Sequence, residues 1–296
     1  MQLEAQNQQH AIENRISFRT HQHMIVAELV SDHSTALISL YGAQVLSFIP
    51  NGQKDLLFVS QESFYQEGKA IRGGIPVCWP WFGGHPTEKG KPSHGFARLS
   101  HWQVIQTKSE NGNTVLQLGL CDSDKTRNLW PFSFDAMVTI TVGKSLQVEM
   151  TTRNTGEQPF TITGALHTYF NVSQSEQVSI EGLKETSFMD DVKGVESRQE
   201  EPLLKLKGEV DRCYLDTTGG CIIDDPAFDR KIKVEKQGSK STVVWNPGAN
   251  LAKQMKDLGD GEFASMVCVE AANALKDQIN LMPGESHTLS TQIGLV

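Results

Sequence analysis

A succession of short β-rich runs, beginning at about residue 24, narrows the folds open to this chain. Runs such as MIVAELV, TALISLYGAQVLSFI and LLFVS are separated by Gly, Asn, Asp and Pro clusters, a pattern typical of strands joined by turns. The stretch FSFDAMVTITVGKSLQVEMTTRN alternates apolar and polar residues, as in sheets with one buried and one solvated face. We therefore predict an all-β fold, a large antiparallel β-sandwich with few short helices.

Turn and helix signals add local detail. Asn111-Gly112, Gly219-Gly220 and Gly238 each lie between two β-rich runs and predict hairpins. SQESFYQEG after residue 60 and ANLAKQMKDL from Ala249 each predict two or three helical turns. In FASMVCVEAANAL the alanines favour a helix, whereas MVCVE is typical of a buried strand. We predict a strand there as far as Glu270.

Length and composition are those of a single packed domain. The 296 residues contain 38% hydrophobic and 21% charged residues, enough apolar surface for one large β core. We see no repeat, linker or composition shift, so we predict a loosely held arm over residues 1–20 and one domain over residues 21–296. A net charge of -8 without a basic block argues against nucleic acid or an anionic membrane as partner.

The N-terminal sequence, the apolar runs and the cysteines indicate the cellular compartment that we expect for this protein. MQLEAQNQQHAIENR lacks the basic and apolar regions of a signal peptide, and no run approaches the roughly 20 apolar residues of a membrane span. Five scattered cysteines without a C-x-x-C pair are typical of reduced thiols. We expect a cytoplasmic protein that is a monomer or a weak homo-oligomer.

In the segment IRGGIPVCWPWFGGHP, residues 71–86, we expect no regular secondary structure. Its glycines and prolines predict a rigid loop, and its two tryptophans offer apolar walls suited to the C–H face of a sugar. The alternative is a structural loop whose tryptophans plug one end of the sandwich. A few residues later, SHGFARLSHW contains His94 and Arg98. Arg98 alone is compatible with an ordinary surface residue, but together with Arg72 it would make a phosphate site.

Three further segments place ionisable residues in unusual positions. GALHTYF puts His167 inside an apolar run, where it is either a hydrogen-bonded core histidine or a functional group. MVCVEAANA does the same with Glu270, and a glutamate is rarely buried without a partner or a task. Asp211 precedes CYLD next to Arg212; such a pair is most often simply solvated.

Taken together, RGGIPVCWPWFG, HGFAR, LHTYF, Asp211-Arg212 and Val269-Glu270 resemble the glucose-6-phosphate 1-epimerase (hexose-6-phosphate mutarotase) family of the aldose 1-epimerase superfamily, in order and spacing over nearly the whole chain. The resemblance implies the galactose mutarotase-like β-supersandwich. It also implies roles for individual residues. These are His167 as general acid, Glu270 as general base, Arg72 and Arg98 on the phosphate, His94 and Asp211 on the sugar, and Trp245 in VVWNPG at the pocket edge.

The implied reaction needs one acid and one base. The base removes the O1 proton of a hexose 6-phosphate, the acid protonates the ring oxygen, and the opened ring closes on the other face of C1. We expect Glu270 and Asp211 to raise the pKa of His167. Such chemistry requires no metal or redox cofactor, and the sequence has no P-loop, Rossmann glycine pattern or His-x-x-x-His arrangement, so we expect none.

Two other functions remain open. A mutarotase of free sugars is favoured if Arg72 or Arg98 turns away from the pocket. A carbohydrate-binding or sensing protein on the same fold would not need both His167 and Glu270. Catalysis requires that these two side chains meet.

Overall fold

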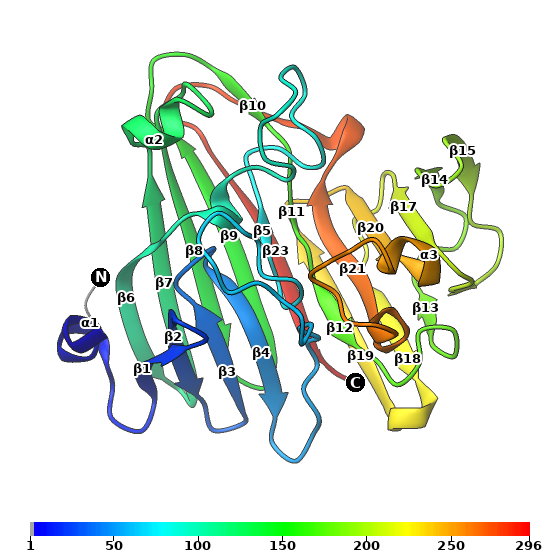
Figure 1. Cartoon of the computed structure of the whole chain (residues 1–296), viewed down its shortest axis with the longest axis horizontal. Helices are drawn as coiled ribbons and strands as arrows, with labels where there is room; N and C mark the ends of the chain where they lie inside the picture. The colour runs from blue at the N-terminus through cyan, green and yellow to red at the C-terminus, as the bar shows by residue number, and fades with distance from the viewer. Residues whose placement is uncertain (1–2) are drawn as a thin grey trace.

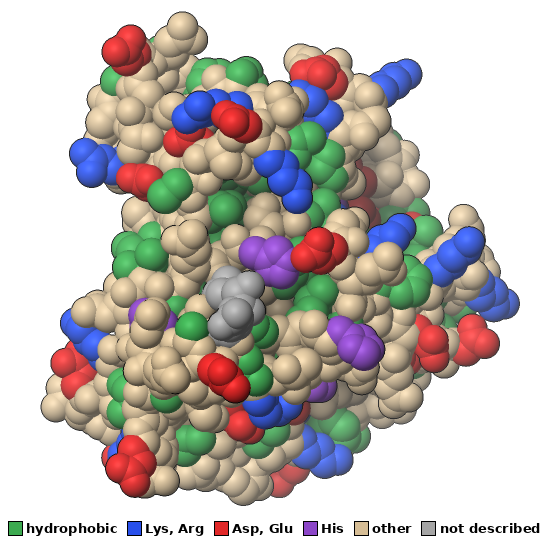
Figure 2. Space-filling view, turned by 60° about the vertical axis from the view of Figure 1, so that its left-hand side comes forward, with side chains coloured by type: hydrophobic (Ala, Val, Ile, Leu, Met, Phe, Trp, Pro, Cys, Tyr) green, Lys and Arg blue, Asp and Glu red, His purple; other side chains and the backbone are tan. Residues whose placement is uncertain are grey.

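The computed structural model describes residues 3–296 as a stack of antiparallel sheets (Figure 1). Every pairing between its described strands is antiparallel, so the predicted all-β sandwich is confirmed. None of the helices among residues 3–296 is long and apolar enough to cross a membrane. On the face drawn in Figure 2, basic side chains are interspersed with acidic ones.

The largest sheet has nine strands. In spatial order they are β16 (Leu203–Lys205), β13 (Ser179–Glu181), β18 (Cys221–Asp225), β19 (Arg230–Gln237), β23 (Ser286–Leu295), β9 (Leu146–Asn154), β8 (Phe134–Val142), β7 (Asn113–Cys121) and β6 (Gln103–Glu110). Along β8 the burial alternates strictly, because apolar residues at every second position face the core.

A second sheet has eight strands and carries the predicted site residues Asp211, Trp245 and Glu270. Its order is β15 (Val195–Arg198), β14 (Ser187–Asp190), β17 (Val210–Tyr214), β20 (Ser241–Asn246), β21 (Met266–Asn273), β11 (Gly164–Leu166) and β5 (Val77–Cys78), and β12 (Tyr169–Asn171) also pairs with β21. A four-stranded sheet runs β1 (Ile16–His21), β2 (Met24–Val30), β3 (Ser34–Ser39), β4 (Gln44–Pro50), and β10 (Phe160–Ile162) pairs with β22 (Ile279–Leu281).

Helices are few and short, as predicted. They are α1 (Leu3–His10), α2 (Asp124–Arg127) and α3 (Gly248–Ala252), with single 3₁₀ turns at η1 (Ala97–Leu99), η2 (Pro226–Phe228), η3 (Glu262–Ser265) and η4 (Leu275–Asp277).

The nine-stranded sheet is the common support of the other two. The four-stranded sheet packs on it through β2 against β7 and β3 against β8, and the eight-stranded sheet packs through β21 and β11 against β23. Figure 1 shows both smaller layers lying against this one large sheet. A continuous apolar cluster fills the space between the layers, from Ile16 in β1 to Ile293 in β23. Burial of this cluster is the main driving force for folding.

The predicted hairpins are partly correct. Asn111 and Gly112 both have positive φ and form the two-residue turn between β6 and β7. The hairpins predicted at Gly219-Gly220 and at Gly238 are wrong, because β17 and β20 belong to the eight-stranded sheet whereas β18 and β19 belong to the nine-stranded one. These glycines mark crossings between sheets. At Gly238, which has a φ of +69°, a Cβ atom would overlap the carbonyl oxygen of Thr288.

The helix predictions are partly correct, and the predicted N-terminal arm contains regular secondary structure. SQESFYQEG forms no helix, because its serines bond elsewhere: the Ser60 hydroxyl donates to Glu262 and the Ser63 hydroxyl accepts from the Arg72 amide. ANLAKQMKDL contributes only the end of α3, and FASMVCVEAANAL contains β21, which is a strand as predicted and runs on to Asn273. Residues 3–20 of the predicted arm form α1 and most of β1, paired with β2, while residues 1–2 lie outside the described residues.

Gly74 illustrates how tightly the glycine-rich loop is held. Its amide donates to Phe58, its carbonyl oxygen accepts from Tyr169, and with a φ of +62° it leaves no room for a Cβ atom beside Val45. We predict that Gly74→Ala lowers the free energy of unfolding by roughly 2–5 kcal/mol through left-handed strain and overpacking. Gly52, with a φ of +75° but open space around it, is the matched control. Gly52→Ala should cost only about 1–2 kcal/mol. Urea denaturation measures both; equal losses would contradict the packing argument.

Candidate active site

Strand register places four residues in one row, of which Asp211 and Trp245 were predicted site residues and Cys268 and Tyr169 were not. Asp211 in β17 lies opposite Trp245 in β20, and Trp245 lies opposite Cys268 in β21. Cys268 in turn lies opposite Tyr169 in β12. Because directly opposed residues share a face of the sheet, and residues two apart on one strand do so as well, Glu270 lies on the same face.

This face points away from the sandwich core. The alternate residues Val244, Val267, Val269 and Ala271 pack into the main apolar cluster between the sheets. Asp211 and Trp245 are only partly buried. The core therefore fixes the strands from one side and leaves the row of functional groups on the other.

His167 lies in the short connection between β11 and β12. Its amide donates to the Pro76 carbonyl oxygen at 3.0 Å. Its ring stacks on Tyr169, with centroids 4.7 Å apart and planes at 10°, and meets the edge of Trp245 at 5.9 Å. These contacts fix the ring so that Nδ1 lies 3.3 Å from Glu270 Oε1.

The His167–Glu270 contact is close but is not a hydrogen bond. His167 Nδ1 and both Glu270 carboxyl oxygens are buried without any hydrogen-bond partner. The side chains are 9% and 1% exposed, so water cannot solvate the contact freely. Leaving such groups unpaired costs about 1–3 kcal/mol each. The alternative of a satisfied core histidine is therefore wrong for His167.

Burial also sets the protonation of the pair. Burial, with help from His94, Arg98 and Arg72, holds the pKa of His167 well below its usual value. Burial and the Asp211 carboxylate hold the pKa of Glu270 well above its usual value, although Arg98 opposes this. The expectation that Glu270 and Asp211 raise the pKa of His167 is wrong, because burial and the nearby cations outweigh the carboxylates. Both shifts favour the uncharged form of the pair, in which the proton is on Glu270.

Arg72 is strongly engaged by the protein itself. Its Nε and Nη2 donate to Asp257 Oδ2 at 3.2 and 3.0 Å, and its Nη1 donates to the Tyr169 hydroxyl at 2.8 Å. A guanidinium has five N–H donors, so two remain for a ligand. The side chain is 22% exposed, and its charge is largely balanced by Asp257.

Arg98 and His94 come from the segment after the glycine-rich loop. Arg98 Nη2 donates to the Ser93 carbonyl oxygen at 2.9 Å, while its Nε is buried without a partner. The His94 ring lies 5.8 Å from that of His167, centroid to centroid. Burial, with Arg98 and Arg72, lowers the pKa of His94 to about 3. Since Nδ1 accepts from the Gly83 amide at 3.2 Å, the neutral ring of His94 has its proton on Nε2.

The remaining predicted residues divide between site and scaffold. Asp211 is near enough to act on Glu270, and burial raises the pKa of Asp211 to about 6. Trp79 and Trp81 are 2% and 4% exposed and pack on Phe96. The loop tryptophans therefore plug the sandwich, and their predicted role as apolar walls for a sugar is not supported. Trp245 is the tryptophan beside the pair.

Sequence reasoning missed three residues at this site. Tyr169 stood in the quoted motif LHTYF but had no role, and Cys268 stood two residues before Glu270 in MVCVE. Asp257 gave no signal, since it lay in a segment predicted to be an ordinary helix. Its partner Arg72 is distant in the sequence, and only the fold brings them together.

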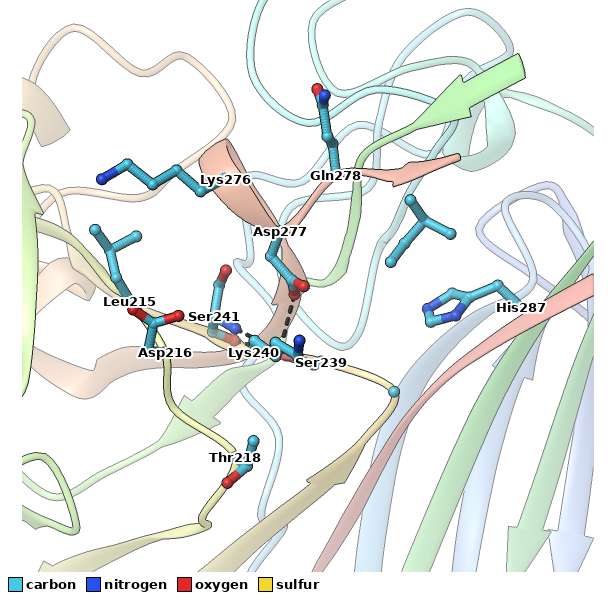
Figure 3. Close-up of a pocket in the computed structure, with 12 residues that line it drawn as sticks. Leu215, Asp216, Thr218, Ser239, Lys240, Ser241, Lys276, Asp277, Gln278 and His287 are labelled. Carbon is cyan, nitrogen blue, oxygen red and sulfur yellow. Dashed lines mark hydrogen bonds between the residues drawn. The ribbon is translucent and has the colours of Figure 1, made fainter. Parts of the chain in front are cut away.

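A cavity elsewhere provides a contrast (Figure 3). It holds about 530 Å³ and is lined by residues that include Lys240, Asp277 and His287. Several of its polar groups are paired with one another: Asp277 Oδ2 accepts from the Lys240 amide at 2.7 Å and from Asn273 at 2.8 Å, and Asn273 Oδ1 lies 3.0 Å from His287 Nε2. The His167–Glu270 contact, with its unpaired atoms, is the better candidate for an active site.

Comparison with known proteins shows the family of this chain. A family model described as aldose 1-epimerase matches residues 26–294. A protein of Escherichia coli (strain K12) named "Putative glucose-6-phosphate 1-epimerase" is 36% identical over 253 residues, covering 84% of this chain and 84% of that protein. A protein of Cenchrus ciliaris with the same name is 36% identical over 260 residues, covering 84% of this chain and 78% of its own length.

Solved structures show the same fold. The crystal structure of a "putative mutarotase" from Salmonella typhimurium aligns with a TM-score of 0.91 at 30% identity, covering 97% of this chain and 95% of that one. A "galactose mutarotase related enzyme" from Lactobacillus acidophilus aligns with a TM-score of 0.74 at 15% identity, covering 92% and 97% of the two chains. The predicted galactose mutarotase-like fold is confirmed, and the chain belongs to the aldose 1-epimerase family.

Proposed function

We propose that this protein interconverts the α and β anomers of a hexose 6-phosphate, with glucose 6-phosphate as the expected substrate. The observation that supports it most strongly is the His167–Glu270 contact of 3.3 Å, made by buried atoms that have no other partner. The names of the Escherichia coli and Cenchrus ciliaris relatives support this choice of sugar. Two arginines close to the pair support a phosphorylated substrate.

The proton on Glu270 moves before the ring opens. In the resting protein the cations Arg98 and Arg72 help keep His167 neutral. A phosphate dianion between them offsets that field, so the Glu270 proton passes to His167 Nδ1. The result is a carboxylate base beside an imidazolium acid. Substrate binding thus prepares both groups in one step.

Ring opening then needs two proton transfers. The Glu270 carboxylate accepts the O1 proton while His167 Nε2, the ring nitrogen not directed at Glu270, donates to O5 and the C1–O5 bond breaks. Rotation about C1–C2 presents the other face of the aldehyde carbon to O5. Ring closure returns the O5 proton to His167 and the O1 proton from Glu270, so both residues end as they began.

The flanking residues orient the sugar. Arg98, with one protein hydrogen bond at Nη2 and an unpaired Nε, is the stronger phosphate ligand, and Arg72 adds its two remaining donors. His94 Nε2–H is a donor, and Asp211 is an acceptor for sugar hydroxyls. Trp245 provides an apolar wall beside His167. Fixing the register of the sugar in this way brings C1 to the acid–base pair.

One observation favours free sugars as an alternative substrate class. Asp257 neutralises much of the Arg72 charge, which weakens the attraction for a phosphate. A binding or sensing protein is less well supported, since binding alone does not need a proton donor and a proton acceptor side by side.

The first test measures anomer exchange by NMR. We expect the wild-type protein to accelerate exchange of glucose 6-phosphate well above that of free glucose. His167→Ala and Glu270→Gln should each reduce the catalysed rate by about 10²–10⁴-fold, because each removes one general acid or base. His33→Ala and Glu181→Gln, at exposed positions, are matched controls. Acceleration of neither sugar by the wild-type protein would overturn the proposed function.

A second test separates phosphate binding from chemistry. Arg98→Ala and Arg72→Ala should raise KM for glucose 6-phosphate by about tenfold to a hundredfold, since each removes charge-assisted hydrogen bonds. Neither substitution should change the turnover of free glucose as strongly as it changes that of glucose 6-phosphate. Arg212→Ala is the control. The Arg212 guanidinium lies over the Phe188 ring, 4.6 Å from its centroid, in surroundings different from those of Asp211. Equal effects on both sugars would assign the arginines a structural role.

A third test uses the pH dependence of stability. Because burial raises the pKa of Glu270 in the folded protein, this group favours folding at low pH, and its contribution is lost as the pH rises above about 4.3, the unfolded value, toward the folded one. Glu270→Gln removes that loss. We expect its stability relative to wild type to increase as the pH rises from about 5 toward the raised pKa of Glu270.

Thermal unfolding across this pH range measures the effect. The exposed Glu181→Gln should show no such trend. A difference between Glu270→Gln and wild type that stays constant with pH, or decreases as the pH rises, would contradict the raised pKa of Glu270.

A further inference from the structure

We propose that His167, Cys268 and Glu270 also form a binding site for a thiophilic divalent cation of the Zn²⁺ class, and that an ion bound there blocks the acid–base pair. Metal binding rests on geometry alone. Only its effect on catalysis rests on the proposed function.

The three donors already lie close together. One ligand atom from each, an imidazole nitrogen, the Cys268 Sγ and a Glu270 oxygen, lie within 4.8 Å of one another, and all three residues are buried. Zinc bonds of about 2.0–2.1 Å to nitrogen and oxygen, at tetrahedral angles, separate two such ligands by roughly 3.3 Å. The observed His167 Nδ1 to Glu270 Oε1 distance is 3.3 Å. Two of the ligand positions therefore need little movement.

The donors lack competing partners inside the protein. His167 Nδ1 and both Glu270 oxygens accept or donate no hydrogen bond. Cys268 is 0% exposed, so its sulfur is held at the site and kept from bulk water. An ion placed among these atoms would satisfy all of them at once. A Cys, His and carboxylate set suits zinc, which leaves a fourth position for water.

The surrounding charge permits a cation. Arg98 lies near the pair, and so does the His94 ring, whose Nδ1 accepts from the Gly83 amide. Arg72 is balanced by Asp257. Asp211 adds a carboxylate on the same face, so Arg98 is the one uncompensated positive charge among these neighbours. Binding forms the metal–sulfur and metal–oxygen bonds as the Cys268 thiol and the Glu270 carboxyl group each give a proton to solvent.

The consequence for catalysis follows from position. An ion between Nδ1 and the carboxylate occupies the lone pairs that move the substrate proton. It also stops proton transfer from Glu270 to His167. We expect saturating Zn²⁺ to abolish the catalysed anomer exchange and a chelator to restore it.

The test titrates the metal-free protein with Co²⁺, a spectroscopic substitute for Zn²⁺, and with Zn²⁺ by calorimetry. A near-ultraviolet thiolate-to-cobalt charge-transfer band at one ion per chain supports the site. Cys268→Ser should abolish that band and weaken Zn²⁺ binding by at least about 10–100-fold. Cys213→Ser is the matched control, since Cys213 is also a buried thiol, opposite Val243 in the strand next to β21. It should keep the band.

The outcomes separate this inference from the proposed function. No band in the wild type, or a band that survives Cys268→Ser or disappears in Cys213→Ser, overturns the metal site whatever the activity. A band that behaves as expected in a protein without mutarotase activity supports the metal site and overturns the proposed function. Zn²⁺ that binds through Cys268 but leaves exchange unchanged overturns the blocking effect.

Discussion

The approach of His167 Nδ1 to Glu270 Oε1 without a hydrogen bond is unfavourable, and the rest of the fold holds it in place. Glu270 is fixed because β21 lies between β20 and β11 and its alternate residues are locked in the main core. His167 is fixed from the other side by the Pro76 carbonyl and by the ring of Tyr169. The folding energy of the large apolar core thus maintains a contact that would relax in a small domain.

Tyr169 links the two halves of the proposed site. Its ring stacks on His167, and its hydroxyl accepts from Arg72. Arg72 is held in turn by Asp257. A ligand that pulls on the Arg72 guanidinium therefore acts on a side chain in direct contact with the proposed acid. This contact chain provides a physical route by which a ligand bound to Arg72 affects His167, in addition to the electrostatic one.

Much of the fold was predictable because period-2 alternation and Asn-Gly turns are local signals, as in β8 and at Asn111-Gly112. The hairpin predictions at Gly219-Gly220 and Gly238 were wrong because a glycine indicates a required backbone angle but not which sheet the next strand joins. The predicted site residues do gather near one pair. The protonation of His167 was not predictable, since it depends on burial and on arginines that only tertiary structure brings near. Asp257 was missed for the same reason.

Buried polar atoms without a hydrogen-bond partner also indicate where a ligand gains the most binding energy. Among the described residues, eight buried side-chain nitrogen or oxygen atoms lack a hydrogen-bond partner, and four of them belong to Arg98, His167 and Glu270. In the cavity near Lys240 the Asp277 carboxylate is already paired, so a ligand that binds to it must compete with existing bonds. At the His167–Glu270 site a ligand supplies bonds that the protein does not make for itself. Binding there recovers part of an energetic cost already incurred in folding, which favours a polar ligand such as a sugar over an apolar molecule of similar size.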